Sequence, residues 1–148
     1  MTPSGPATLT LRVPPHPDLC RVARRRIADF ARSKGVGDGD LAAVLTAAGE
    51  ALANAVEHGR SEAPLSIECT IAPDRIVVTI GDLGVGFDCY PVVPRELPEP
   101  EAERGRGLAL MRRFSDIFSV QPLPGGGTVV VVGRYRRDAI TPPTSRSA

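Results

Sequence analysis

The sequence predicts a single α/β domain in which helices cover a partly antiparallel sheet. The chain has 148 residues and 42% hydrophobic content, which is enough for one core and too little for two. Short runs alternate apolar and polar residues as half-buried strands do, and longer runs repeat apolar residues at helical spacing. Two alternating runs, 65–71 and 75–80, are separated only by Ala-Pro-Asp, which predicts an antiparallel hairpin.

The first two elements are a strand and an amphipathic helix. Residues 7–13 alternate apolar and polar side chains, and the prolines that follow end the strand. Asp18 is a good N-cap for a helix that continues to Gly35, where a C-terminal cap fits. The polar face of this helix carries four arginines, which we interpret as a solvated surface: Arg21, Arg24, Arg25 and Arg32.

A second helix is predicted from Asp40, as its cap, to His58. Glu50 and Asn54 lie one turn apart on the side of this helix that faces away from its apolar stripe. Small residues on that side, which are Ala43, Ala47 and Ala51, are expected to leave room beside this polar pair. One broad apolar stripe faces the core and consists of Leu41, Val44, Leu45, Ala48, Leu52, Ala55 and Val56.

The C-terminal half is predicted to contain a lid, a helix and a strand. Residues 89–104 hold four prolines and four glutamates, a long loop that we interpret as a lid. Three glycines introduce a last strand at 127–137. We therefore expect a flexible start at 1–6, one domain over 7–137 and a disordered tail at 138–148. The intervening third helix is marked by Leu108, Met111, Phe114, Ile117 and Phe118.

Composition argues against several classes of function. The net charge of +1 gives no general attraction to nucleic acid or to anionic lipid. Three cysteines without paired spacing suggest neither a disulfide framework nor a zinc site, which favours a reducing compartment. No apolar run approaches the roughly 20 residues of a spanning helix, and the start lacks signal-peptide features. We expect a cytoplasmic protein without direct membrane or nucleic-acid binding.

Two glycine-rich stretches have the composition of phosphate and base contacts. In RGRGLAL, Gly105 and Gly107 leave backbone N–H groups open at the positive end of a helix dipole, while Arg104 and Arg106 add charge. In GDLGVGFD, Asp82 ends a strand, and Gly84 and Gly86 allow a tight reversal against a flat ligand. A carboxylate there can accept a hydrogen bond from an exocyclic amine, which would favour adenine over guanine.

The Glu50 and Asn54 pair suits a metal-bound triphosphate. Magnesium takes one or two oxygen ligands from protein and completes its shell with phosphates and water, and the Asn54 carbonyl suits that role. Glu50 would then reach the terminal phosphate, where it could accept a proton from an attacking hydroxyl. Competing motifs fit less well, because no GxxxxGK[ST] occurs and neither glycine run has the context of a dinucleotide fold. Thr128 is either a plain strand residue or a pocket hydroxyl.

The ordered set ExxxNAxxHG, DxGxGFD, GRGLxLM and GGGT resembles the boxes of the gyrase, chaperone, histidine kinase and mismatch-repair ATPase superfamily (GHKL). Within it, the set is similar to the small anti-sigma factor serine/threonine kinase branch, over residues 7–137. The resemblance implies a Bergerat-type two-layer α/β (α+β) sandwich, with a mixed, mostly antiparallel sheet and helices on one face. It also implies Mg-ATP held beneath a mobile lid.

The resemblance assigns a role to each box by position. It implies that Glu50 is the general base and that Asn54 is the magnesium ligand. It implies that Asp82 reads adenine beside the turn at Gly84 and Gly86, and that Thr128 helps to bind the base. The phosphate-binding box comprises Arg104, Gly105, Arg106, Gly107 and Leu108.

Similar proteins bind a sigma factor and phosphorylate a serine or threonine of a STAS-domain anti-anti-sigma antagonist. The resemblance therefore implies a protein kinase that is also an anti-sigma factor, and by analogy a homodimer. The alternative is a binding module that uses nucleotide to set its shape and sequesters a partner without phosphorylating it. A hydrolase with a transducer domain and a histidine kinase core both need more chain than is present here.

Overall fold

The computed structural model describes residues 5–58, 62–82, 103–122 and 127–137. The elements run in the order β1 (Ala7–Val13), α1 (Pro17–Ser33), α2 (Asp38–His58), β2 (Leu65–Ile71), β3 (Arg75–Asp82), α3 (Glu103–Arg113), β4 (Ile117–Pro122) and β5 (Thr128–Tyr135). The expected tail at 138–148, most of the expected lid and the first four residues of the expected flexible start lie outside the described residues.

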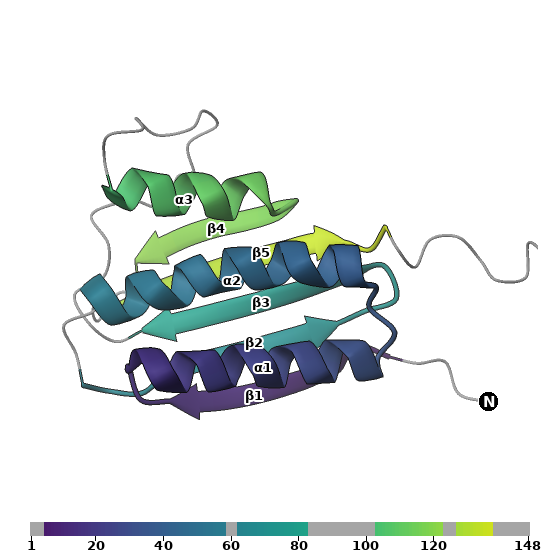
Figure 1. Ribbon diagram of the computed structural model, residues 1–148, viewed down its shortest axis with the longest axis horizontal. Coiled ribbons are helices and arrows are strands. Elements are labelled where there is room, and N and C mark those ends of the chain that lie inside the picture. The colour runs from purple at the N-terminus through teal and green to yellow at the C-terminus, as the bar shows by residue number, and fades with distance from the viewer. Residues whose placement is uncertain (1–4, 59–61, 83–102, 123–126, 138–148) are drawn as a thin grey trace, which may run out of the picture.

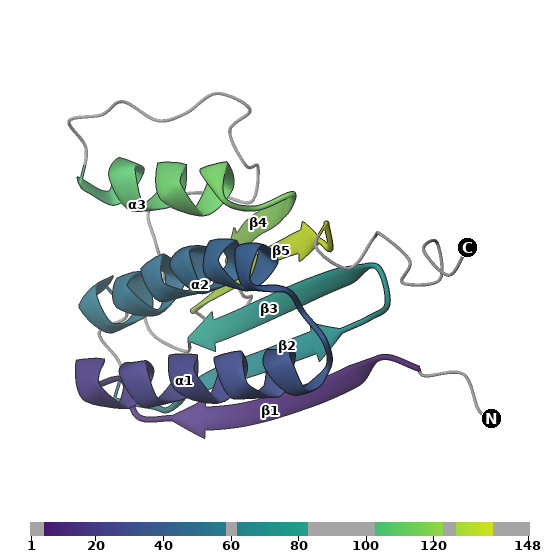
Figure 2. The same ribbon diagram turned by 45° about the vertical axis from the view of Figure 1, so that its right-hand side comes forward.

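The strands form one five-stranded sheet in the order β1-β2-β3-β5-β4. The sheet was expected to be mixed and mostly antiparallel, and every pairing of the described strands is antiparallel. All three helices lie on the same face of the sheet, so the domain has two layers, as predicted (Figures 1 and 2). The core lies between the layers, and its largest fully buried side chains include Ile27, Leu52, Ile67, Ile80 and Met111.

The boundaries of α1 and α2 differ from the predicted capping residues. The N-cap of α1 is His16, and Asp18 lies in the first turn, where it forms an ion pair with Arg21. Gly35 has φ of +83°, a left-handed conformation that suits the predicted C-terminal end of the helix. Asp40 is not the cap of α2, which starts at Asp38. It is fully buried inside the first turn and has a different role, described below.

The predicted third helix is in fact a helix followed by a strand. Helix α3 ends at Arg113, and Ile117 and Phe118, which were assigned to it, begin β4. The backbone N–H of Asp116 donates to the Gly133 carbonyl at 2.7 Å, and from there the chain pairs with β5. Helix α3 also starts earlier than expected, so Glu103 and Arg104 belong to it instead of to the loop.

The C-terminal end of β5 ties the elements together at one end of the sheet. Arg136 donates from Nη1 to the Ala72 carbonyl at 2.8 Å and from Nη2 to the Lys34 carbonyl at 3.3 Å. These bonds join β5 to the turn between β2 and β3 and to the C-terminal end of α1. The predicted functional residues belong to the opposite end of the sheet, where β3 ends and β5 begins.

Candidate functional site

Glu50 and Asn54 lie on α2 where this helix packs against α3. Asn54 is buried, with 7% of its surface exposed, and Glu50 is half-buried. Ala47 and Ala51, on the same side of α2, are also fully buried. These alanines were expected to leave room beside the polar pair, but the structure shows them covered, on a helix that packs against α3.

Gly107 is the point where α3 approaches the polar pair. A Cβ at this position would lie 3.2 Å from Asn54 Nδ2, 3.5 Å from Asn54 Oδ1 and 3.4 Å from Glu50 Oε1. Any side chain at position 107 would therefore fill the space beside both groups. The glycine was predicted to lie just before the helix. It is instead the fifth residue of α3, and Gly105 is the third.

The amide of Asn54 is not satisfied within the described part of the chain. Its Nδ2 atom is buried and has no hydrogen-bond partner there. A buried polar atom without a partner is unfavourable by about 1–3 kcal/mol, so such atoms in folded proteins usually contact water, an ion or a ligand. The neighbouring carboxylate of Glu50 and the amide oxygen of Asn54 are hard oxygen donors of the kind that magnesium prefers, and Gly107 has no side chain that would crowd them.

Asp82 and Thr128 form a second polar pair at the ends of adjacent strands. They face each other across the β3–β5 ladder, and both are buried, with 4% and 2% of their surfaces exposed. Both continue the series of side chains that point toward the helices, after Ile80 on β3 and before Val130 on β5. A carboxylate and a hydroxyl therefore lie together on the helix-covered face of the sheet.

The two pairs belong to the same end of the domain. Figure 1 shows that β3 ends, β5 begins, α2 ends and α3 begins at that end. Three of the predicted site residues, Glu50, Asn54 and Gly107, are thus brought together between α2 and α3. Leu108, the next residue of α3, is half-buried against the hydrophobic core. Gly84 and Gly86 lie outside the described residues. Arg104, Gly105 and Arg106 belong to the first turns of α3, and the structure does not describe the side chains of the two arginines.

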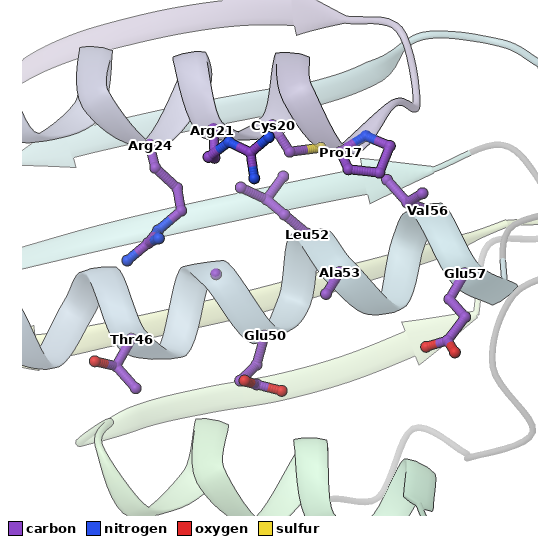
Figure 3. A pocket seen from close by; sticks show the side chains of 11 residues that line it. Pro17, Cys20, Arg21, Arg24, Thr46, Glu50, Leu52, Ala53, Val56 and Glu57 are labelled. Carbon is purple, nitrogen blue, oxygen red and sulfur yellow. The ribbon is translucent and has the colours of Figure 1, made fainter.

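Glu50 also lines a groove that the sequence did not predict. The groove has a volume of about 610 Å³ and lies between α1 and the outer surface of α2 (Figure 3). Its lining includes Arg24, which was assigned to the solvated arginine face of α1. That assignment is wrong for Arg24, whose Nε atom is buried over Gly49. The available signal was Gly49 itself, a poor helix former placed directly before Glu50.

The cysteines described by the structure have packing positions. Cys20 on α1 and Cys69 on β2 are both buried free thiols. Burial raises the pKa of Cys69 to about 12 and also raises that of Cys20. Neither thiol is therefore a reactive thiolate near neutral pH. No group of three or more metal-ligating side chains of the His, Cys, Asp and Glu type occurs among the described residues, and no helix in that part could cross a bilayer.

Comparison with known proteins identifies the family. Residues 13–133 match the histidine kinase-like ATPase domain, so the chain belongs to that family and has its ATP-binding type of domain. Within the family it belongs to the anti-sigma factor and serine-protein kinase branch. An anti-sigma F factor of Clostridium beijerinckii is 32% identical over 116 residues, which cover 74% of this chain and 81% of that protein.

A second relative agrees with this assignment, and a solved structure agrees with the fold. The serine-protein kinase RsbW of Bacillus velezensis is 26% identical over 137 residues, which cover 86% of this chain and 84% of the relative. A crystal structure of RsbU and RsbW domains from Mycobacterium tuberculosis superposes with a TM-score of 0.65 at 18% identity. It covers 88% of this chain and 33% of the longer chain, and it supports the fold alone.

Proposed function

We propose that this protein is an ATP-dependent serine/threonine protein kinase that also acts as an anti-sigma factor. In this proposal it binds a sigma factor and phosphorylates a STAS-domain antagonist of that complex. The observation that carries the kinase assignment is the joint position of Glu50 and Asn54 against Gly107. A module that only binds nucleotide has no need of a carboxylate beside the terminal phosphate, so Glu50 favours a phosphotransferase.

Each residue of the site has a role in this reaction. Asn54 Oδ1 would hold magnesium, and the open backbone N–H groups at the start of α3 would bind phosphate oxygens. Asp82 would accept a hydrogen bond from the adenine amine, and Thr128 would support the base beside it. Magnesium, when bound, neutralises charge on the phosphate oxygens. The described residues fit this nucleotide, because the carboxylate of Glu50, the amide of Asn54 and the side-chain-free position of Gly107 meet at one place.

Glu50 would act as the general base. Its carboxylate would accept the proton of the serine or threonine hydroxyl while that oxygen forms a bond to the terminal phosphorus. The bond between that phosphorus and the bridging oxygen breaks, ADP leaves, and the acceptor becomes a phosphate ester. Because Glu50 also lines the groove on the outer side of α2, it is accessible to a protein substrate.

The kinase assignment is tested with labelled ATP and a purified STAS-domain protein from the same organism. We expect transfer of label to a serine or threonine by the wild-type protein and no measurable transfer by Glu50→Ala. Transfer that persists in Glu50→Ala would remove Glu50 from its role. Binding of Mg-ATP without transfer to any STAS partner would favour the alternative, a nucleotide-dependent sequestering protein.

The anti-sigma assignment and the homodimer need separate measurements. Co-purification with sigma factors of the same cell, with and without ATP, tests the first, and retention of no sigma factor in either condition would remove this part of the proposal. Light scattering of the purified protein tests the second, for which a mass of about twice 15.6 kDa is expected.

A further inference from the structure

The groove beside Glu50 lies across the outer surface of α2. One wall is formed by α1, through Pro17, Cys20, Arg21 and Arg24, and the apolar side chains of Leu52 and Val56 rise toward it from α2 (Figure 3). Figure 3 also shows Glu50 projecting from the side of α2 that faces α3. The groove therefore connects a cationic, partly apolar wall with the carboxylate that we assign to catalysis.

Glu50 borders both the region next to Gly107 and the groove. On one side its Oε1 atom lies 3.4 Å from the position of a Cβ on Gly107, where the nucleotide phosphates are proposed to bind. On the other side it lines the groove, whereas Asn54 and Gly107 do not. The groove therefore reaches Glu50 from a side that Asn54 and Gly107 do not line.

Small residues of α2 line part of the groove. Gly49 and Ala53 both lie on the outer surface of α2, and Ala53 is exposed. At Gly49 a Cβ would lie 3.2 Å from Arg24 Nε and 3.4 Å from Arg24 Cζ. The absence of a side chain at position 49 therefore allows the guanidinium of Arg24 to lie against α2.

Arg24 has no partner for its charge within the described part of the chain. Its Nε atom is buried and makes no hydrogen bond there, and Arg24 forms no ion pair there. The neighbouring Arg21 differs, because it is paired with Asp18 and its side chain is 71% exposed. A partly buried guanidinium without a partner is unfavourable, and its planar set of donors best fits a carboxylate.

We propose that this groove receives the substrate segment that carries the phosphorylated hydroxyl, and that Arg24 selects segments with a carboxylate near that hydroxyl. The proposal rests on the kinase activity proposed above and names its acceptor as an acidic polypeptide segment. Pro17, which is exposed, and Val56, which is half-buried, would pack on the segment.

The test measures steady-state phosphorylation of the purified STAS-domain acceptor by four proteins. These are the wild type, Arg24→Gln, Gly49→Ala and the control Arg25→Gln, which removes an exposed charge from the same helix outside the groove. We expect Arg24→Gln to raise the acceptor KM by about tenfold or more, because a desolvated charged pair is lost. The kcat and the KM for Mg-ATP should stay within about twofold, because Arg24 does not touch the nucleotide side.

Gly49→Ala tests the position of Arg24 without changing Arg24 itself, and we expect this variant to fold. Alanine is a better helix former than glycine, and its methyl group would displace the flexible guanidinium from its position over α2. We therefore expect a raised acceptor KM together with an unchanged or higher melting temperature. Charge reversal by Arg24→Glu should be rescued by replacing one acidic residue near the acceptor hydroxyl with arginine.

Three outcomes separate this inference from the proposed function. No transfer by the wild-type protein would overturn both. Transfer by the wild type, with Arg24→Gln indistinguishable from Arg25→Gln, would overturn the role of Arg24 alone. A raised KM for Mg-ATP in Arg24→Gln, with an unchanged acceptor KM, would place Arg24 on the nucleotide side and overturn the acceptor groove.

Discussion

The two ends of α2 each bury a polar side chain, and within the described residues only the one near the N-terminal end has hydrogen-bond partners. Near the N-terminal end, Asp40 accepts hydrogen bonds from Arg134 Nε at 2.8 Å and from the Arg137 backbone N–H at 2.7 Å. Near the C-terminal end, Asn54 has a buried Nδ2 atom with no partner in the described part of the chain. Asp40 joins the end of β5 to the helix, whereas the described residues supply no hydrogen-bond partner for Asn54 Nδ2.

This difference is the one expected between a structural polar residue and the functional residue that we propose. A buried carboxylate with short bonds from two residues of β5 and its C-terminal extension stabilises one arrangement of helix and sheet. An unsatisfied amide beside a half-buried carboxylate and a glycine reduces stability unless a ligand binds. Substitutions at the two ends should therefore change different quantities, and the predictions below use this contrast.

The largest expected effect is on catalysis at the C-terminal end. Glu50→Gln should lower kcat for phosphoryl transfer by about 10²–10⁴-fold, the usual contribution of a general base. Because Glu50 makes no hydrogen bond or ion pair within the described part of the chain, the melting temperature should hardly change. Single-turnover transfer and calorimetric melting measure the two quantities. A large loss of stability with retained transfer would make Glu50 structural and remove the contrast.

Asp40→Ala should have the opposite profile. It leaves Arg134 without its buried partner, and removing one member of such a pair destabilises a protein by about 3–5 kcal/mol. We expect the lower end of that range, because the Arg134 side chain is 23% exposed and can gain water. Urea unfolding measures the change, with Asp38→Ala in the same turn as an exposed control. Equal stability of the two variants would contradict the proposed clamp.

Gly107→Ala should weaken nucleotide binding with little effect on folding. The added methyl group would lie 3.2 Å from Asn54 Nδ2 and would occupy the space beside Glu50. A displacement that removes about 1.4 kcal/mol of binding free energy raises the Kd for Mg-ATP about tenfold. A suitable control is Gly81→Ala, whose methyl group would meet nothing closer than 3.9 Å. Unchanged Mg-ATP affinity in Gly107→Ala would separate α3 from the nucleotide.

The smallest effect is expected at Asp116, which pairs with Arg137 beyond the Asp40 clamp. The hydrogen bond from Arg137 and that from the Tyr135 backbone N–H hold the pKa of Asp116 below its ordinary value of 3.8. A lowered folded-state pKa gives stability that is present above pH 3.8 and is lost as the pH falls through the folded-state value. Because Arg137 is half-exposed, Asp116→Asn should cost no more than about 1 kcal/mol at pH 7.

Thermal unfolding of the Asp116→Asn variant and the wild type from pH 7 to pH 2 measures this dependence. The difference between them should shrink as the pH falls below 3.8. A difference that is constant over the whole range would show that the charge of Asp116 is not the cause.

The sequence predicted those parts of the fold that depend on local periodicity. The apolar stripe of α2 is buried as expected, with Leu52 at 1% exposure, and the hairpin of β2 and β3 has the predicted connection. The boundary between α3 and β4 was missed, because Phe114 and Ile117 continue the helical spacing by chance. What ends the helix is pairing of residues 117–122 with β5, which is not local in sequence.

Prediction of the site was limited for the same reason. Glu50, Asn54, Asp82 and Thr128 were predicted because their types and order carry a recognisable chemistry, and their roles stay predictions. The roles of Asp40 and Arg24 depend on contacts with Arg134 and Gly49, which are distant in the chain. From the sequence, Asp40 resembled a helix cap and Arg24 resembled a surface charge. Rules that use only neighbouring residues place a side chain on its own helix and do not show its contacts with other elements.

The most direct test of the central claim is calorimetric titration of the folded protein with ATP in the presence of magnesium. We predict one binding site per chain in the wild type, with affinity lowered at least about tenfold in Asn54→Ala and retained in Glu50→Gln. If the wild-type protein takes up no adenine nucleotide, or if Asn54→Ala binds as tightly as the wild type, the unsatisfied end of α2 is not the nucleotide site.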